Sequence, residues 1–490
     1  MNRLTNDELT RIARRAMIEN GFAPVVPPEA VDAAESLEEE PLNLRADSNV
    51  RDLRFLLWSS IDNETSRDLD QLEYAEKLPN NDIKLLVAIA DVDQAVPKDS
   101  PIDKYAGKNT VSVYAGNHVF PMLPEQLSTN LTSLNEAVDR RAVVIEMIVR
   151  ADGDVRTSDV YRAFVHNYAK LSYEEIGEWL DENAAAPEDF ARVKGLEAQI
   201  RLQFETAERL YELRKKNGAL EFETIEAAPV VAGGAIADLK TERRANSARR
   251  IIENFMIAAN VETAEFLERR HFLSLRRVVK IPARWHRIVE IADSFGERLP
   301  ENPDSVALAE FLERRRKADA VHFPDLSLSI IKLLGAGEYV VQEPDTDADG
   351  HFGLAVQDYA HSTAPNRRYA DLIVQRLLKA AIAGENSPYT REELNEIAAR
   401  CNERESRARK VERQIRKTIA ASVMSSRVGE IFDAIITGVN RSGTFARTLR
   451  PPVDGRIVAG ENGLQVGDKV RVKLIDTDAE KGFIDFAYRH

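Results

Sequence analysis

The sequence feature that most constrains the fold is an acidic segment that directly follows an apolar one. The apolar residues 55–58 (FLLW) predict a buried strand that runs into the segment 59–72, SSIDNETSRDLDQL. This segment places the carboxylates of Asp62, Asp68 and Asp70 within nine residues. Like charges this close raise each other's pKa unless a cation lies among them. The segment therefore predicts a divalent-metal site, and oxygen ligands of this kind suit magnesium, with manganese as an alternative.

Two other interpretations of this segment are open. Acidic runs at strand ends are most often solvated turns. A calcium loop would use positions one, three, five, seven, nine and twelve, which here are Asp62, Glu64, Ser66, Asp68, Asp70 and Glu73. Its sixth position needs glycine for a sharp bend but is Arg67, and no helix leads into the loop. Calcium is therefore disfavoured, whereas two metals roughly 3.5–4 Å apart are a common device for cleaving phosphodiesters.

Length and composition describe a large globular protein. The chain has 490 residues, of which 43% are apolar and 30% charged, enough for roughly three domains or for one large domain with small appendages. No apolar run approaches the roughly 18 residues of a membrane span, and the first seven residues lack a signal-peptide core. We expect a cytoplasmic, monomeric protein. The single cysteine, Cys401, excludes an internal disulfide and predicts a small core residue on a helix.

Charge is distributed unevenly along the chain. The net charge of −14 argues against a generally basic nucleic-acid-binding surface. Nevertheless, residues 240–250, 269–287 and 404–417 are each net basic. Such runs are often solvated faces. Three of them in an acidic protein also fit a phosphate-tracking groove that is enclosed by an acidic exterior.

The order of apolar patterns predicts three parts. Residues 1–50 should form a small helical, helix-turn-helix-like module, with a helix capped by Thr5 or Asn6 and an acidic segment over 31–40. Residues 51–426 should form a mixed α/β domain. Its expected strands and helices cover 84–90, 142–150, 173–216 with an interruption at 182–188, 218–223, 249–269, 307–317, 326–334 and 402–426.

The last part, residues 427–490, has short alternating strands separated by glycines. Expected strands cover 430–437, 444–449, 469–475 and 483–488. Five short strands in this length suit an all-β OB barrel, a fold that commonly binds single-stranded nucleic acid. Phe445 and Arg447 would lie on its binding face.

A second segment that carries chemistry is 361–376, HSTAPNRRYADLIVQR. Thr363 and Pro365 predict a helix start, which would put Arg367 and Arg368 in the first turn beside free backbone N–H groups. Guanidinium groups at a helix N-terminus make a phosphate site. The alternative is a surface arginine pair that bridges to the acidic segment.

Taken together, four segments resemble the ribonuclease II family, whose catalytic domain is often called RNB. They are SIDNETSRDLDQL, VAIADV with YAGNHVFPMLPEQLS, IIENFMIAAN, and HFGLAVQDYAHSTAPNRRYADLIVQR. The resemblance runs from about residue 51 to residue 424, and the C-terminal barrel matches the OB domain that usually ends these chains. The usual pair of N-terminal cold-shock domains is missing, and the short helical segment stands in its place.

The resemblance implies a hydrolytic, magnesium-dependent exoribonuclease. Such enzymes degrade single-stranded RNA processively from the 3′ end and release 5′-nucleoside monophosphates and a short end product. RNA with a structured region and a 3′ overhang is a further expected partner, and no membrane is expected.

The resemblance also assigns roles to individual residues. Asp62, Asp68 and Asp70, with Gln71, would form the metal site, and Asp70, Asp68 and Arg367 would be catalytic. Five further residues would bind RNA together with Phe445, namely Tyr114 and Phe222 as an aromatic clamp, Tyr173 and Glu253 at the ribose, and Arg368.

The chain departs from the family pattern at one metal position. A fourth aspartate normally follows Asp70, but here the residue is Gln71, which removes one negative charge. Ala364 and Asn366 also replace the commoner Ser and Ile. The alternative function is therefore a catalytically weakened RNA-binding protein with a degenerate RNB domain. A nuclease for single-stranded DNA is disfavoured by Tyr173 and Glu253, because both could sense the 2′-hydroxyl.

Overall fold

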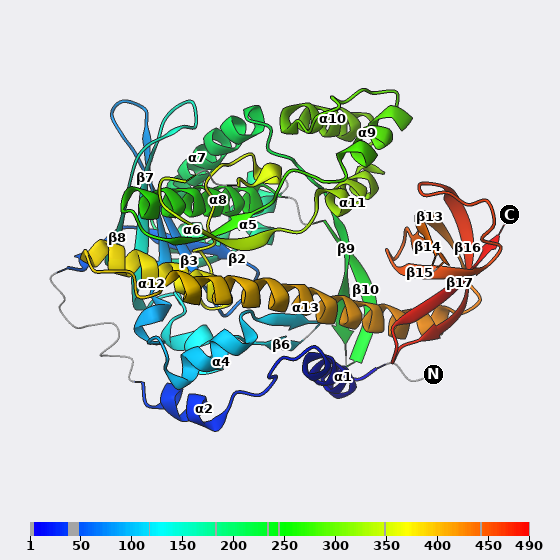
Figure 1. The fold of residues 1–490 in the computed structure, drawn as a ribbon, viewed down its shortest axis with the longest axis horizontal. Coiled ribbons are helices and arrows are strands. Elements are labelled where there is room, and N and C mark those ends of the chain that lie inside the picture. Colours follow the sequence, from blue (N-terminus) through cyan, green and yellow to red (C-terminus); the bar gives the residue numbers. More distant parts are fainter. Residues whose placement is uncertain are drawn as a thin grey trace.

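The computed structural model describes residues 4–37, 49–116, 118–181, 184–232, 235–243, 246–346, 349–441 and 443–489. In Figure 1 the long helix α13 (Arg391–Met424) runs from a large part of mixed sheet and helix to a small barrel at the C-terminal end. This arrangement confirms the predicted mixed α/β domain with an all-β C-terminal domain. Within the described residues, no helix is long and apolar enough to cross a membrane.

A six-stranded sheet forms the centre of the large part. In spatial order its strands are β1 (Arg51–Asp52), β8 (Val155–Ser172), β2 (Trp58–Asp62), β3 (Gln71–Lys77), β4 (Ile83–Ala90) and β7 (Asp139–Val149). β2 runs parallel to β8, and β3, β4 and β7 follow in antiparallel pairs. The predicted strands at 84–90 and 142–150 correspond to β4 and β7. The continuous apolar sequence of β4 is buried along almost its full length, as expected for a central strand.

Helices cover this sheet and supply most of its core contacts. The helices that pack on or beside it are α5 (Tyr173–Leu180), α6 (Glu188–Arg192), α7 (Leu196–Lys216), α8 (Ser247–Arg269) and α12 (Tyr369–Ala383). The prediction of helix over 173–216 with a break, and over 249–269, is confirmed by α5–α7 and α8. Cys401 is buried on α13, as predicted.

Short elements connect the sheet to the rest of the chain. They are η1 (Val92–Gln94), α4 (Pro101–Asn109), β5 (Val113–Ala115), β6 (His118–Phe120), η2 (Leu127–Leu131), β9 (Ile225–Ala232), β10 (Ala235–Arg243), η3 (Phe352–Leu354) and η4 (Ser425–Arg427). β5 pairs with β6, and β9 pairs with β10. Both β5 and β10 contact α13, so this helix joins several distant segments.

A separate group of helices forms its own small core. It contains α9 (Trp285–Ser294), α10 (Ser305–Ala318) and α11 (Phe323–Leu334). Trp285, Ile288 and Phe311 are central to that core. The flanking strands β11 (Ser274–Val278) and β12 (Glu338–Gln342) pair with each other, and their Leu275 and Tyr339 belong to the central core. The helices predicted at 307–317 and 326–334 are α10 and α11.

The N-terminal helices lie in two different cores. α1 (Asn6–Glu19) begins at Thr5 with the predicted cap, and its Leu9 and Ile12 pack with α13 and the barrel. α2 (Pro28–Glu35) packs on α4, and its Ala30 belongs to the central core. The helical character of this segment is as predicted, but the described helices do not share a core of their own. Part of the segment (residues 1–3 and 38–48) lies outside the described residues.

The C-terminal domain is a closed five-stranded barrel. Its strands are β13 (Ile431–Asn440), β14 (Gly443–Thr448), β15 (Asp454–Ala459), β16 (Lys469–Asp478) and β17 (Phe483–Arg489), in the order β13-β14-β15-β17-β16. Four of them were placed by the sequence pattern, whereas β15 was not. Buried side chains such as Ile457 and Phe486 join the same core as α1 and α13. The barrel is therefore packed onto the long helix (Figure 1).

Two predicted strands are wrong. Residues 55–57 are not a buried strand, because Leu56 N donates to Leu53 O at 3.1 Å in a turn, and Phe55 is 74% exposed. β2 starts only at Trp58. Residues 218–223 are not a strand either. There Leu220 N donates to Gly353 O at 2.9 Å, and its side chain packs against the core of α9–α11.

Candidate active site

The acidic segment is fixed in place by neighbouring strands and loops. Lys170 Nζ on β8 donates to the carbonyl oxygens of Glu64 and Ser66 at 2.8 and 2.7 Å. Leu69 N donates to Ser133 Oγ at 2.9 Å, and the Asp70 carbonyl accepts from Ala90 N at 3.0 Å. These bonds hold the segment as a defined turn between β2 and β3 rather than as a solvated acidic loop.

Asp70 lies at the centre of the site and contacts Arg367. Arg367 Nε donates to Asp70 Oδ2 at 3.1 Å, and the backbone N–H of Asn366 donates to Asp70 Oδ1 at 3.1 Å. The Asp70 side chain is 2% exposed, whereas that of Arg367 is 41% exposed. The carboxylate is thus a buried anchor, and the guanidinium faces outward where a substrate can reach it.

Arg367 is positioned by a turn, not by the first turn of a helix. α12 begins at Tyr369 with Arg368 as its N-cap, so the prediction that the helix starts near Thr363 is wrong. Arg367 N donates to Ala364 O at 3.2 Å, and Ser112 N donates to Arg367 O at 2.9 Å. The reason is that Arg368 has an extended backbone and pairs with Val111, so the chain cannot continue from this turn as helix until Tyr369. Within the turn, the N–H groups of Ala364 and Asn366 bind the carboxylates of Asp371 and Asp70.

Arg368 is engaged in an ion pair beside this turn. Its Nη2 donates to Asp371 Oδ1 at 2.7 Å, and the Asp371 side chain is completely buried. The Arg368 side chain keeps 23% exposure. The structure therefore gives Arg368 a role in fixing the start of α12, and its predicted contact with RNA stays a prediction.

Tyr114 joins the same site from β5. Its hydroxyl donates to Asp68 Oδ2 at 3.4 Å, and its backbone N–H donates to Glu412 Oε1 on α13 at 3.2 Å. The residue is 44% exposed, which leaves part of the ring open to solvent. Tyr114 and Arg367 are neighbours because Ser112, just before β5, pairs with the turn that carries Arg367.

Asp62, at the start of the acidic segment, lies near two further polar side chains, those of Gln71 and Tyr173. Gln71 Nε2 donates to Asp62 Oδ1 at 3.5 Å. Tyr173, the first residue of α5, lies near Asp62, and the guanidinium carbon of Arg249 lies 4.3 Å from the centre of its ring. Tyr173 is thus brought near Asp62, while its predicted contact with the ribose stays a prediction.

Burial makes these carboxylates hard to ionise. Desolvation, with repulsion from Asp68 as a smaller cause, raises the pKa of Asp62 to about 6. Desolvation also raises the pKa of Asp70 to about 7, even though Arg367 favours its charged form. Buried carboxylates with raised pKa values are typical of functional sites.

The donor set fits a hard divalent cation. Asp62, Asp68 and Asp70 offer carboxylate oxygens and Gln71 an amide oxygen, and Asp62 Oδ2 is buried without a hydrogen-bond partner. In the described part of the chain, no three Asp, Glu, His or Cys side chains have the spacing of a preformed metal site. The described carboxylates therefore do not form a preassembled metal site, and the predicted cation binding by the three aspartates stays a prediction.

Glu73, which the sequence offered only as position twelve of the disfavoured calcium loop, also belongs to this region. It lies on β3, is completely buried, and has a pKa raised well above its usual range by desolvation and by Asp62. The signal that could have found it is strand alternation, because Gln71 and Glu73 are two residues apart.

Three predicted residues lie elsewhere in the described structure. Phe222 packs against the core of α9–α11, and Glu253 is exposed on α8. Phe445 is half-buried on β14 of the barrel. Their roles stay predictions. Next to Phe445 on the same strand, Arg447 forms an ion pair with Asp454 at 2.8 Å.

The basic segments are used largely for structure where they are described. Arg276 and Arg277 are almost completely buried, and Arg277 makes two bonds to Glu405, at 2.7 and 2.8 Å. Arg250 donates to Glu208 at 3.1 Å. Residues 244–245 lie outside the described part. The predicted phosphate-tracking groove is therefore not formed by these arginines, because internal carboxylates already pair with them.

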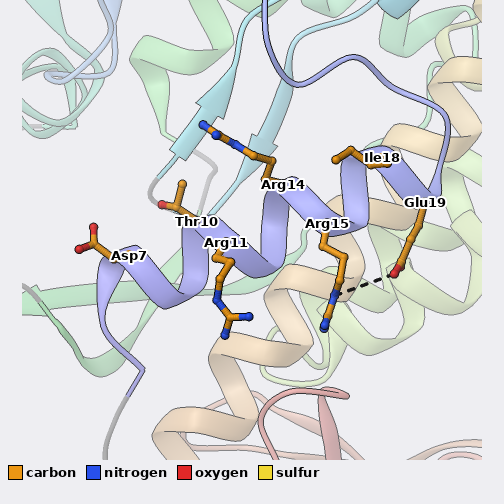
Figure 2. A pocket seen from close by; sticks show the side chains of 7 residues that line it. All are labelled: Asp7, Thr10, Arg11, Arg14, Arg15, Ile18 and Glu19. Carbon is orange, nitrogen blue, oxygen red and sulfur yellow. Dashed lines mark ion pairs between the residues drawn. The ribbon is translucent and has the colours of Figure 1, made fainter.

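A separate surface hollow of about 490 Å³ lies along α1. Figure 2 shows that its lining side chains all come from this one helix, namely Asp7, Thr10, Arg11, Arg14, Arg15, Ile18 and Glu19. None of these residues belongs to the predicted site. The hollow lacks the converging carboxylates that the region around Asp70 contains.

Comparison with known proteins gives a consistent result. The RNB domain matches residues 50–384, and the RNase II-type exonuclease C-terminal S1 domain matches residues 430–489. Ribonuclease R 1 of Lactococcus lactis is 29% identical over 492 residues, which cover 94% of this chain and 59% of that protein. Ribonuclease R of Escherichia coli is 30% identical over 506 residues, which cover 95% of this chain and 60% of that protein. The chain thus spans about three fifths of the length of these curated relatives.

Solved structures match over almost the whole chain. RNase R of Mycoplasma genitalium in complex with ribose methylated single-stranded RNA aligns with a TM-score of 0.87 and 24% identity, covering 99% of this chain and 78% of that one. Its complex with double-stranded RNA aligns with a TM-score of 0.85 and 25% identity, covering 99% and 84%. Both matches are to the same protein in two different complexes, and both give the same fold.

Proposed function

Because this chain belongs to the family of RNB-domain proteins, we propose that it is a magnesium-dependent exoribonuclease that degrades RNA hydrolytically and processively from the 3′ end. The observation that carries this proposal is the meeting of Asp70 and Arg367, which pairs a buried carboxylate with an outward-facing guanidinium beside three further polar site residues, Asp62, Asp68 and Gln71. The proposed products are 5′-nucleoside monophosphates and a short oligonucleotide.

The arrangement suggests a division of labour among these residues. The bond to Asp70 uses Nε of Arg367, so the two terminal nitrogens can bind the phosphate next to the scissile bond and stabilise its developing charge. A divalent ion held by Asp62, Asp68 and Asp70 would activate the attacking water and neutralise charge on the phosphate. Asp70 also fixes the orientation of Arg367, which lowers the cost of ordering it in the transition state.

Two tyrosines flank this centre and would handle the RNA chain. The exposed part of the Tyr114 ring offers a stacking surface for a base near the 3′ end, and stacking is tolerant of sequence. Tyr173, beside Asp62, would lie where a ribose 2′-hydroxyl could be sensed. Phe222, Glu253, Arg368 and Phe445 are carried forward as proposed RNA contacts on the strength of the family resemblance alone.

Substrate range and working state are further proposals. Single-stranded RNA is the proposed main substrate, and RNA with a duplex and a 3′ overhang is a second one. A Mycoplasma genitalium RNase R structure with double-stranded RNA supports testing both. We also propose that the protein works as a monomer in the cytoplasm.

The test is a time course with 5′-labelled single-stranded RNA, in magnesium and in chelator, beside a DNA oligomer of the same sequence. The expected result is conversion of RNA, only with metal, to a short labelled product without a ladder of stable intermediates. RNA that is bound but stays intact under every metal tried would instead identify a degenerate, RNA-binding RNB protein, as the replacement by Gln71 could suggest. Equal degradation of the DNA would contradict the ribose preference.

A further inference from the structure

Glu73, an acidic residue on β3, shares a face of the sheet with Gln71. Strand side chains alternate between the two faces of a sheet, so residues 71 and 73 point the same way. The face that brings Gln71 to Asp62 therefore also carries Glu73. Burial, and to a smaller extent the charge of Asp62, raises the pKa of Glu73 well above its usual range.

Glu73 is buried without any compensating contact among the described residues. It is 0% exposed, and neither carboxylate oxygen has a hydrogen-bond partner. Opposite it on β2, the hydroxyl of Ser59 is also buried without a partner. Gln203 Nε2 donates to the Glu73 carbonyl at 3.3 Å, while Gln203 Oε1 has no donor of its own.

This collection of oxygens is unusual in a protein interior. Buried polar groups are normally hydrogen-bonded, and a buried charge is normally paired or bound to a metal. Here oxygens of Glu73, Asp62 and Gln203 are each buried without a hydrogen-bond partner in the described part of the chain. A bound cation is the partner that would satisfy several of them at once.

We propose that Glu73 is a metal-site carboxylate which supplies to a divalent cation the negative charge that Gln71 does not carry. The inference rests on the proposed function and extends its metal site by one residue. Two residues along a strand span roughly 6.5 Å. The longer glutamate side chain offsets part of that displacement, and Mg²⁺ commonly keeps several of its waters, which a carboxylate can bind.

The test is calorimetric titration of RNA-free, full-length protein with MnCl₂. The variants are Glu73→Gln, Gln71→Asp and the double variant, and Glu262→Gln serves as a control because Glu262 is another buried glutamate, on α8, away from β3. Glu73→Gln should weaken Mn²⁺ binding about tenfold or more. Adding Gln71→Asp to it should restore the affinity to within about threefold of wild type. Glu262→Gln should leave the affinity unchanged.

Thermal melting in chelator separates loss of a ligand from loss of the fold. Glu73→Gln should melt at or above the wild-type temperature, because it removes an unpaired buried carboxyl group. If Glu73→Gln does not fold, the Mn²⁺ affinity of the single variant Gln71→Asp tests the role of Glu73. This variant should change Mn²⁺ affinity by less than about threefold if Glu73 already supplies the charge.

The outcomes distinguish the two proposals. If wild type binds Mn²⁺ and Glu73→Gln binds it equally well, the role of Glu73 is wrong while the proposed function stands. An increase in Mn²⁺ affinity of about tenfold or more in Gln71→Asp would also overturn the proposed role of Glu73. If wild type itself neither binds Mn²⁺ nor degrades RNA, both proposals fail together.

Discussion

Asp70 and Arg367 are 297 residues apart in the sequence, yet Arg367 Nε donates to Asp70 Oδ2 at 3.1 Å. Asp70 follows the acidic turn between β2 and β3, and Arg367 lies in the turn before α12. The adjoining backbone N–H of Asn366 donates to the other oxygen of the same carboxylate. The central sheet and α12 therefore meet at this carboxylate, and most of the predictions below start from it.

Replacing Arg367 by lysine should separate charge from geometry. Lysine keeps the positive charge but loses the planar donor set that binds both Asp70 and a phosphate. We expect kcat to fall about 100-fold, as when a transition-state donor is removed. Single-turnover RNA degradation measures this loss. Arg67→Lys is the matched control, because Arg67 is an exposed arginine of the acidic turn that pairs with Glu125, and wild-type kinetics in Arg367→Lys would contradict its proposed role.

Tyr114 should contribute to RNA affinity through its ring rather than its hydroxyl. Tyr114→Ala removes the stacking surface and should weaken binding of single-stranded RNA about tenfold. Tyr114→Phe keeps the ring and loses only the 3.4 Å bond to Asp68. Fluorescence anisotropy with metal-free protein measures both. If the phenylalanine variant binds as weakly as the alanine variant, stacking is not the cause.

The stability of metal-free protein should fall as pH rises. Burial raises the folded-state pKa of Asp70 to about 7, above its unfolded value near 4. The folded protein then binds more protons than the unfolded one between these values, so stability is lost over this range as pH increases. Asp70→Asn lacks this titration. In chelator, the melting temperature of Asp70→Asn minus that of wild type should therefore be larger at pH 8 than at pH 5. The same difference at both pH values would contradict the raised pKa of Asp70.

Arg277 should matter for stability and not for RNA binding. Its pair with Glu405 is largely buried, so Arg277→Ala leaves this carboxylate with only the longer, exposed ion pair to Arg409 and should cost about 3 kcal/mol. Arg409 pairs with the same Glu405 from an exposed position, and Arg409→Ala should cost less than about 1 kcal/mol. Denaturant unfolding measures both variants. A large loss of RNA affinity in folded Arg277→Ala would instead support the prediction that Arg277 lines a basic RNA-binding groove.

Much of the fold could be predicted because its signals are local. The apolar run of β4, the stripe of α13, the cap at Thr5 and the short strands of the barrel all follow from residue spacing. The wrong strand at 55–57 has the apolar composition of a strand but ends in a turn bond from Leu56 to Leu53. An apolar composition alone does not distinguish a short strand from a turn of this kind.

The site was predictable only in part, for a similar reason. The motif around Asp62 and Asp70 is contiguous, and Arg367 lies in a second contiguous motif. Their contact depends on the turn before α12, which exists because Arg368 pairs with the distant Val111 and does not continue as helix. The sequence offered Glu73 only as a calcium-loop position, because an acidic residue on a strand is usually exposed, and its burial is set by how β2 and β3 pair with their neighbours.

The most direct measurement compares wild type with Asp70→Asn on the same 5′-labelled RNA, recording both the dissociation constant and the rate of degradation in magnesium. If Asp70 anchors the reaction centre, the variant should bind RNA within about threefold of wild type. Its degradation rate should fall by about 100-fold or more. Degradation by Asp70→Asn at the wild-type rate would show that the Asp70–Arg367 pair is structural and that the reaction takes place elsewhere.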